Sequence, residues 1–470
     1  MDVQAKKFDL IIIGSGPAGY LSAIVSAQKG LSAAVIEKRD LGGTCLNRGC
    51  IPTKALLHEA LLWDAFDKSG LIRNKDEAAS YFKRTLEKKD AAVLQVVSGL
   101  RNLLNRDRIT VFQGEASFLN PRTIGVKRDG KVAETLAADR ILIASGAVPK
   151  DEKPLMRDGQ WVIGSDDVLK MGGLPSTLAI IGGGRRGLEF VTFFSAFGVP
   201  ITLIEKENRV LPKMDREISI RFKTLLAKRK VKVLTEAEVT AIDLMEKKES
   251  VGLTVIQKGK KETLEFQKVL VVGKRRGNID DLALEKTSVT LKDGFISVDS
   301  HMKTSSPGIY AAGDVSGKEF YAHKAFHEGR IAVENILGRE SQADYRMIPR
   351  CLYAYPEAAS IGLTEEEAIQ EHGEVAIGKF PFMACGRSIA TGLSEGMVKI
   401  ISEKKYGEIL GVHMLGPHAT ELIHLGAIAM RHEIGVEEIK EMIVAHPTFS
   451  EAFSEAALDT YGEAIHMIKA

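Results

Sequence analysis

Two segments of this chain repeat one arrangement of glycines, and this repeat constrains the fold more than any other feature. The first copy comprises, in order, the apolar run 8–13, the glycines Gly14, Gly16 and Gly19, a helical pattern over 20–29, and a second apolar run, 33–36, that ends in Glu37. Such a strand, glycine turn, helix and acidic strand end are typical of a βαβ unit that binds a dinucleotide.

The second copy follows the same order with the same spacing from the first glycine to the acid. It comprises the apolar run 178–181, the glycines Gly182, Gly184 and Gly187, a helical pattern to residue 197, and the run 201–204 that ends in Glu205. Glycines let the backbone approach a pyrophosphate at a helix N-terminus, and the carboxylate accepts hydrogen bonds from a ribose. The sequence therefore predicts two dinucleotide sites.

Further strand patterns around the second copy indicate how the domains are connected. Residues 140–146 and 308–314 are apolar runs that end in small residues, and we interpret both as returns to the first domain. After residue 350, short β-rich runs alternate with helical patterns, as in an α+β domain. The predicted fold is α/β, with two Rossmann-like domains and a C-terminal α+β domain. The predicted boundaries are 1–150 with 276–347, then 151–275, then 348–470.

Length and charge limit the function classes. At 470 residues the chain is long enough for two or three domains. Its 64 basic and 62 acidic residues give a net charge of +2, so a nucleic acid is not an expected partner. We see neither a secretion signal at the N-terminus nor an apolar run long enough for a bilayer, and therefore expect a soluble, cytoplasmic protein without a membrane partner.

Cys45 and Cys50 form a close pair, and a close pair in a reducing compartment is typical of catalysis or metal binding. Pro52 suits a first helical turn, which predicts that Cys50 lies near a helix N-terminus, where the pKa of a thiol is lowered. A structural zinc site needs four ligands, and we find no second Cys or His pair nearby at metal spacing. We therefore predict a redox pair and no metal site.

His446 and Glu451 lie around a proline turn near the C-terminus. An isolated histidine of this kind is often only a surface residue. Thiol–disulfide exchange, however, needs a base for the thiol proton, and an imidazole oriented by a carboxylate provides one. We interpret the other histidines as structural, and Cys351 and Cys385 as inert buried thiols.

The motifs resemble, in order and spacing over nearly the whole chain, the dihydrolipoamide dehydrogenases of the pyridine nucleotide-disulphide oxidoreductase family. The matching segments are GSGPAGY, GGTCLNRGCIPTK, ASGAVP, GxGxxGLE, IYAAGDV, AHKA, GLTEEEA, EGMVKII, GVHMLGPHATELI and AHPTFSEA. The resemblance implies an FAD domain, an NAD domain and a C-terminal dimerisation domain.

The resemblance also implies roles for individual residues. The residues implied for FAD binding are Gly14, Gly16, Gly19, Glu37, Lys54, Ser145, Gly146, Gly313, Asp314 and Ala322. The residues implied for the second nucleotide are Gly182, Gly184, Gly187, Glu189 and Glu205. Cys45 is then the thiol that exchanges with lipoamide, Cys50 the thiol beside the flavin, and Lys54 a partner of Glu189.

The implied reaction converts dihydrolipoamide and NAD⁺ into lipoamide and NADH. His446, oriented by Glu451, is implied to act on the cysteines of the other subunit, so that a homodimer with shared active sites is expected. The implied partners are lipoyl-bearing proteins of 2-oxo acid dehydrogenase or glycine-cleavage complexes.

Two departures from the family pattern leave alternatives open. Arg185 and Arg186 replace an apolar or aromatic pair, and the run 272–278 has an extra basic residue, Lys274, and no proline. These changes suggest altered nucleotide affinity or NADPH use, although Glu205 would repel a 2′-phosphate and favours NAD. The alternatives are a glutathione-reductase-like enzyme, or a flavoprotein whose nicotinamide turnover is impaired by the two arginines.

Overall fold

The computed structural model describes residues 5–71, 76–245 and 249–467. Contacts between residues divide the chain into two compact units, each built from three segments. The first unit is Met1–Leu56, Arg84–Asp151 and Gly273–Tyr345, and the second is Leu57–Lys83, Glu152–Val272 and Arg346–Ala470. Residues 57–83, which the sequence assigned to the first domain, therefore group with the second unit, and the three-domain division stays a prediction.

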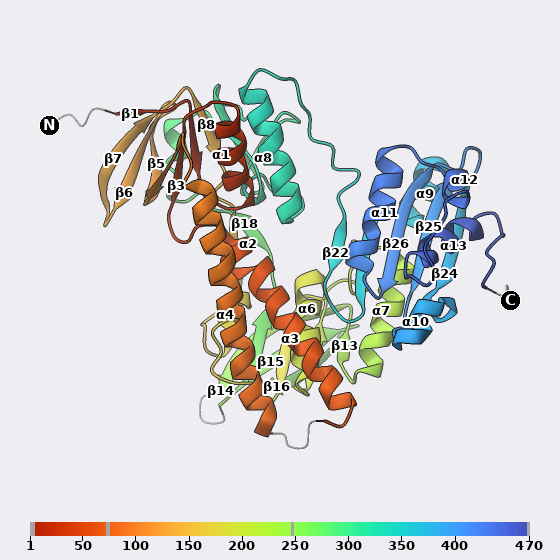
Figure 1. The fold of residues 1–470 in the computed structure, drawn as a ribbon. Coiled ribbons are helices and arrows are strands. Elements are labelled where there is room, and N and C mark those ends of the chain that lie inside the picture. The colour runs from red at the N-terminus through yellow and green to blue at the C-terminus, as the bar shows by residue number, and fades with distance from the viewer. Residues whose placement is uncertain (1–4, 72–75, 246–248, 468–470) are drawn as a thin grey trace. The chain divides into compact units, whose positions relative to one another are not determined.

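The first unit is built on a five-stranded parallel sheet, seen with its helices in Figure 1. In spatial order its strands are β21 (Ile309–Ala311), β8 (Arg140–Ile143), β2 (Leu10–Ile13), β3 (Ala33–Glu37) and β4 (Ile109–Gln113). Strands β2, β3 and β8 are almost completely buried because both faces of the sheet are covered, which explains their unbroken apolar runs. The two predicted returns, β8 and β21, lie beside β2 as expected.

Helices α1 (Pro17–Gln28) and α8 (Ala322–Ile336) pack side by side in this unit (Figure 1). The Ser22 hydroxyl donates to the carbonyl of Gly329 at 3.1 Å. A second sheet, with strand order β1, β7, β6 and β5, also belongs to this unit. These strands are Lys6–Lys7, Lys131–Ala137, Thr123–Arg128 and Glu115–Asn120, and the short pair β9 (Ala147–Pro149) and β18 (Arg275–Gly277) lies apart from both sheets.

The second unit contains another five-stranded parallel sheet. Its strands, in spatial order, are β10 (Val162–Ile163), β17 (Lys268–Val271), β11 (Leu178–Ile181), β12 (Ile201–Ile204) and β13 (Lys232–Leu234). Helices α6 (Arg185–Ala196) and α7 (Arg216–Lys228) belong to this part, with an antiparallel sheet of β14 (Ala237–Met245), β15 (Ser250–Gln257) and β16 (Lys260–Phe266). The second glycine repeat therefore lies in a second Rossmann-like sheet, as predicted.

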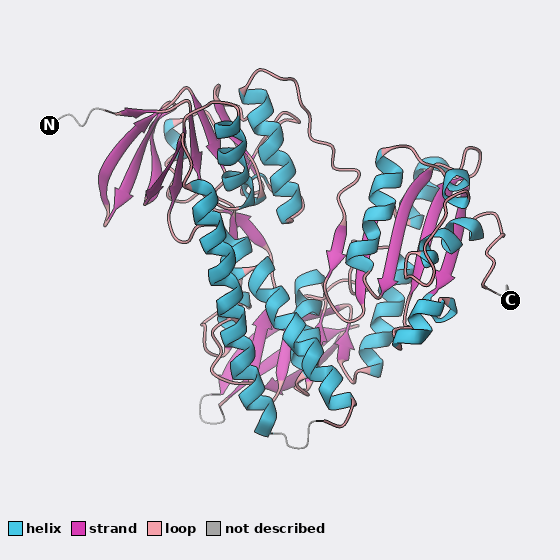
Figure 2. Ribbon diagram, in the orientation of Figure 1, coloured by secondary structure: helices cyan, strands magenta, loops and turns pink. Residues whose placement is uncertain are grey.

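The C-terminal part of this unit is a five-stranded antiparallel sheet with helices beside it, as Figure 2 shows. Its strands, in spatial order, are β22 (Arg350–Leu352), β23 (Glu357–Gly362), β26 (Ile409–Gly416), β25 (Met397–Glu403) and β24 (Val375–Pro381). Its helices are α9 (Glu365–His372), α10 (Gly386–Thr391), α11 (Ala419–Arg431), α12 (Val436–Lys440) and α13 (Glu451–Asp459). Helix α11 packs on β26 and β23, and α13 packs on β24 and β25, which confirms the predicted α+β arrangement.

Among the helices in the described residues, none combines enough length with enough apolar character to cross a membrane.

Candidate active site

The first glycine turn brings strand β2 and helix α1 into close contact. A Cβ added at Gly19 would lie 1.9 Å from the carbonyl oxygen of Gly14, so only glycine fits at this crossing. Gly16 is the N-cap of α1, and Pro17 occupies the first helical position. Among the described residues, no atom lies within 4 Å of a Cβ added at Gly16. The helix N-terminus therefore faces open space, where its N–H groups are available to a phosphate.

Glu37 is fixed at the end of β3, next to this turn. Its Oε2 accepts hydrogen bonds from the backbone N–H of Ser15 at 2.9 Å and from the Ser15 hydroxyl at 2.6 Å, and its Oε1 accepts from the N–H of Arg39 at 2.8 Å. The carboxylate is thus held beside the glycine turn. The sequence did not identify the contribution of Ser15, although this residue stands between the first two glycines.

Ser145 and Gly146 follow β8 at the same edge of the sheet. The nearby backbone is tightly packed, since a Cβ at Gly14 would lie 2.5 Å from the carbonyl oxygen of Ala144. Asn278 holds this turn through Nδ2, which donates to the carbonyl of Ser145 at 3.1 Å. Among the described residues, the buried Ser145 hydroxyl has no hydrogen-bond partner. An unsatisfied hydroxyl beside an open helix N-terminus fits a polar ligand such as the pyrophosphate of FAD.

The predicted residues Gly313 and Asp314 lie in a loop that packs against α1. Gly313 has φ of +85°, and a Cβ there would lie 3.3 Å from the Cβ of Ala18. Asp314 opens a short 3₁₀ turn, Asp314–Ser316, and Ala322 is the first residue of α8. The structure thus brings this loop to the helix of the first glycine turn, although the two are about 300 residues apart in sequence.

The second glycine turn repeats this geometry in the second unit. A Cβ at Gly187 would lie 1.9 Å from the carbonyl oxygen of Gly182, and no described atom lies within 4 Å of a Cβ at Gly184, the N-cap of α6. Glu205 is held through Oε2, which accepts from the N–H of Gly183 at 2.5 Å. The turn fits the pyrophosphate and ribose of a second dinucleotide.

Cys45 lies on α2 (Gly43–Arg48), and Cys50 begins α3 (Cys50–Lys68), as the position of Pro52 predicted. A hydrogen bond with the Cys50 side chain, together with burial, raises the pKa of the Cys45 thiol. Burial and the two cysteines also raise the pKa of Tyr20 on α1 to about 12. Tyr20 was not among the predicted site residues, although it ends the GSGPAGY motif.

The sequence also predicted that Lys54 pairs with Glu189 and that there is no metal site. Lys54 lies on α3, four residues after Cys50, and Glu189 is buried on α6, where its Oε1 accepts from the N–H of Tyr353 at 3.4 Å. The predicted pairing of Lys54 with Glu189 stays a prediction. Within 5–71, 76–245 and 249–467, no group of three or more His, Cys, Asp or Glu residues is arranged to hold a metal ion.

His446 and Glu451 lie together in the second unit, as their spacing predicted. Nδ1 of His446 is 2.7 Å from Oε1 of Glu451, and Oε2 accepts from the N–H of Thr448 at 2.7 Å. The His446 side chain is 73% exposed, so its other nitrogen, Nε2, is accessible to a substrate or a partner. Burial raises the pKa of Glu451, but the hydrogen bonds from His446 and Thr448 outweigh it, and the net pKa is lowered.

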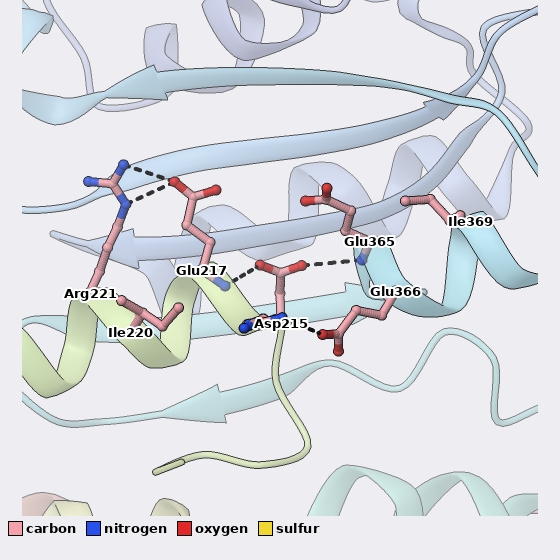
Figure 3. Close-up of a pocket in the computed structure, with 8 residues that line it drawn as sticks. Asp215, Glu217, Ile220, Arg221, Glu365, Glu366 and Ile369 are labelled. Atoms are coloured by element: carbon pink, nitrogen blue, oxygen red, sulfur yellow. Dashed lines mark hydrogen bonds and ion pairs between the residues drawn. The ribbon is translucent and has the colours of Figure 1, made fainter. Parts of the chain in front are cut away.

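A cavity of about 410 Å³ also lies in the second unit, and none of the predicted site residues lines it (Figure 3). Its lining residues are Asp215, Arg216, Glu217, Ile220, Arg221, Glu365, Glu366 and Ile369. The carboxylates that line it are paired with bases, for example Asp215 with Lys399 at 2.9 Å and Glu217 with Arg221 at 2.9 Å. Because it contains neither a glycine turn nor a thiol, we do not assign the redox chemistry to it.

Comparisons with known proteins agree with this geometry. Residues 8–329 match the family model "Pyridine nucleotide-disulphide oxidoreductase", and residues 348–457 match the dimerisation domain of the same family. A dihydrolipoyl dehydrogenase of Bacillus subtilis (strain 168) is 39% identical over 98% of this chain and 100% of its own length. A mitochondrial dihydrolipoyl dehydrogenase of Arabidopsis thaliana is 37% identical over 98% of this chain and 91% of its own length.

Solved structures are similar over the same extent. The HOCl-induced flavoprotein disulfide reductase RclA from Escherichia coli, as a Cu(II) complex, has a TM-score of 0.85 and 27% identity, covering 96% of this chain and 99% of that one. LpdA from Mycobacterium tuberculosis has a TM-score of 0.86 and 25% identity, covering 97% of this chain and 99% of that one.

Proposed function

Because the chain belongs to the pyridine nucleotide-disulphide oxidoreductase family and is similar to dihydrolipoyl dehydrogenases, which use FAD and NAD, we propose that it is a dihydrolipoamide dehydrogenase. One observation carries the proposal: Cys45 on α2 and Cys50 at the start of α3 are in hydrogen-bond contact, in the same unit as the first glycine turn. A thiol pair in contact forms and breaks a disulfide without a large backbone movement.

The cysteines exchange a disulfide with the substrate in the proposed reaction. A thiolate of dihydrolipoamide attacks the sulfur of Cys45, the Cys45–Cys50 bond breaks, and the Cys50 thiolate leaves. The second substrate thiolate then attacks the mixed disulfide, which releases lipoamide and leaves both cysteines reduced. FAD, when bound, supplies the two-electron acceptor between the cysteines and NAD⁺. The balance is one dihydrolipoamide oxidised, one NAD⁺ reduced and one proton released.

His446 is the proposed base that receives the thiol protons. It takes the proton of the attacking dihydrolipoamide thiol. The reduced Cys45 thiol, whose pKa is raised, also needs a base to remove its proton before the disulfide with Cys50 can re-form. The Glu451 carboxylate orients the imidazole through Nδ1 and stabilises its protonated form. This arrangement leaves Nε2 free to accept the proton of a thiol.

NAD is the proposed second nucleotide rather than NADP. Glu205 is held in place by the N–H groups of Gly183 and Glu207, where it suits a ribose diol and repels a 2′-phosphate. Lys206 is paired with Glu238 at 2.7 Å, so its positive charge is already balanced by a carboxylate. Arg185 and Arg186 are the first two residues of α6, where their charges suit a pyrophosphate.

A homodimer with shared active sites is the proposed assembly. The match of residues 348–457 to the family's dimerisation domain supports it, and the exposed His446 belongs to that part of the chain. Lipoyl-bearing proteins of 2-oxo acid dehydrogenase or glycine-cleavage complexes are the proposed partners. The names of the curated relatives, dihydrolipoyl dehydrogenases, support a lipoyl group as the substrate. A cytoplasmic location remains an expectation from the sequence.

Subunit complementation tests the shared site. His446→Gln and Cys45→Ser homodimers should each be inactive, whereas exchange of their subunits should restore one working site per heterodimer. Loss of a general base costs about 10²- to 10⁴-fold in rate, so even partial exchange is visible. Absence of recovery despite verified exchange would contradict a base from the other subunit.

The activity itself is tested by steady-state turnover of the purified holoprotein. We expect NADH formation from dihydrolipoamide and NAD⁺. Activity should be low when NADP⁺ replaces NAD⁺ or when glutathione replaces dihydrolipoamide. Efficient NADPH-dependent reduction of glutathione disulfide would favour the reductase alternative. Reduction of the flavin by dihydrolipoamide without reoxidation by NAD⁺ would instead indicate that Arg185 and Arg186 impair nicotinamide turnover.

A further inference from the structure

A fully buried ion pair lies in α8, outside the residues predicted for chemistry. Nζ of Lys324 is 3.1 Å from Oε2 of Glu328, and neither side chain has any exposed surface. Burial costs several kcal/mol per ion, and a packed apolar pair of similar volume is often as stable. Lys324 is also the third residue of α8, where the helix dipole disfavours a cation. Fold stability alone therefore gives a poor account of this pair.

The pair holds both ends of the loop 313–317. Nζ of Lys324 donates to the carbonyl of Gly313 at 3.2 Å and to the carbonyl of Gly317 at 2.9 Å. Oε2 of Glu328 accepts from the N–H of Gly313 at 2.7 Å and from the hydroxyl of Ser316 at 3.3 Å. Gly313 is thus fixed through both of its backbone groups.

This loop needs such support because of its backbone conformation. Gly313 and Gly317 have φ of +85° and +75°, and glycine loses more conformational freedom on folding than any other residue. The 3₁₀ turn between them contains Asp314, the residue implied to contact FAD. Since Gly313 packs on Ala18 of α1, the loop's shape also sets the distance between Asp314 and the first glycine turn.

Tyr345 fixes the other oxygen of the same carboxylate. Its hydroxyl donates to Oε1 of Glu328 at 2.6 Å. Burial, together with the charge and hydrogen bond of Glu328, raises the pKa of Tyr345, so the phenol remains a donor at neutral pH. Both oxygens of Glu328 are therefore engaged, one with the loop and Lys324 and the other with Tyr345.

We propose that Lys324 and Glu328 are positioning residues that hold the loop 313–317 in the conformation that binds FAD. Lys324 bridges the two ends of the loop, Glu328 anchors Gly313, and Tyr345 orients Glu328. The inference rests on the proposed function only through FAD, and it is independent of the thiol chemistry and of the choice of disulfide substrate.

The test compares two buried lysines in the full-length protein. Lys324→Met removes the bridge, and Lys399→Met is the matched control, because Lys399 is equally buried, pairs with Asp215 at 2.9 Å and lies in the second unit. FAD is removed, and its rebinding is titrated by flavin fluorescence. We expect Lys324→Met to weaken FAD binding about tenfold or more, while Lys399→Met changes the dissociation constant less than twofold.

Hydrogen exchange gives a readout that does not depend on activity. The Gly313 amide should be protected in wild-type apoprotein and should exchange faster in Glu328→Leu. Glu328→Gln keeps an oxygen acceptor for this amide and should show a smaller change in both exchange and FAD affinity. The Gly313 exchange rate and the FAD affinity of Tyr345→Phe should lie between those of Glu328→Gln and wild type. This variant provides the test if Lys324→Met does not fold.

Equal loss of FAD affinity in Lys324→Met and Lys399→Met would overturn the inference, because it would reflect general destabilisation. Wild-type FAD affinity in Lys324→Met would overturn it as well. So would wild-type FAD affinity in both single variants, Tyr345→Phe and Glu328→Leu. Failure of the wild-type protein to bind FAD would instead refute the proposed function.

Discussion

The proposed reaction uses Cys45 and His446, which lie in different units of the chain. The hydrogen bond to Cys50 and burial raise the pKa of the Cys45 thiol, so a base for its proton is part of the proposed exchange. His446 is exposed and is oriented by Glu451 at 2.7 Å. Residue type and spacing predicted a redox pair and a histidine base, and the family resemblance implied their individual roles. The raised pKa of Cys45 depends on its hydrogen bond to Cys50 and on burial, which spacing alone does not give.

Replacement of the base and of its orienting carboxylate should have graded effects. His446→Gln should lower the rate of NAD⁺ reduction by dihydrolipoamide about 10²- to 10⁴-fold. Glu451→Gln should cost less, because the imidazole is present but loses its charged partner. The measurement is steady-state kinetics on both variants, with FAD content as the control. Equal activity of wild type and Glu451→Gln would contradict the orienting role.

Glu451 also predicts a pH dependence of stability. Its pKa is lowered in the folded protein from an ordinary value of 4.5, so the stabilisation is present above that value and is lost as the pH falls through the lowered pKa. Thermal unfolding of wild type and Glu451→Gln should therefore differ at pH 7 and converge in stronger acid. A difference that grows as the pH falls would contradict this assignment.

At the scale of elements, each glycine turn needs a residue without a side chain where its helix packs closely against its strand. Gly187→Ala would place a methyl group 1.9 Å from the carbonyl oxygen of Gly182, so α6 would have to move from β11. We expect FAD to remain bound and dihydrolipoamide still to reduce it, while NADH binding weakens more than tenfold. Gly173→Ala is the control in the same unit, because no described atom lies within 4 Å of a Cβ there. Normal NADH titration of Gly187→Ala would contradict the assignment of the second site.

Both βαβ units were predictable because the local sequence pattern and the packing of each unit favour the same strands and helix. Strand β11 begins and ends where the apolar run does, whereas α1 starts three residues before its predicted start, because Pro17 occupies the first helical position. The Lys324–Glu328 pair could not be predicted. A Lys and a Glu four residues apart are typical of an exposed helix face, and only packing of α8 against α1 and the loop 313–317 buries them.

On the scale of the whole molecule, buried charges also tie segments that are distant in sequence. In the second unit Lys399 on β25 contacts Asp215, the N-cap of α7, and Glu365 at the start of α9 (Figure 3 shows the two acids). Lys399→Met leaves Asp215 buried without its cation and should lower the free energy of unfolding by about 3–5 kcal/mol. Lys399→Met with Asp215→Asn should recover part of this loss in denaturant unfolding. A double variant less stable than Lys399→Met would contradict the account.

In the proposed reaction, electrons pass from the reduced Cys45–Cys50 pair to bound FAD. The most direct measurement of this step is the visible absorbance spectrum of the purified holoprotein and two variants. Two-electron reduction of wild type should produce long-wavelength absorbance from the Cys50 thiolate beside the flavin. Cys45→Ser should show this absorbance without reduction, and Cys50→Ser should not show it in either state. Absence of the long-wavelength absorbance from both reduced wild type and unreduced Cys45→Ser would contradict the account.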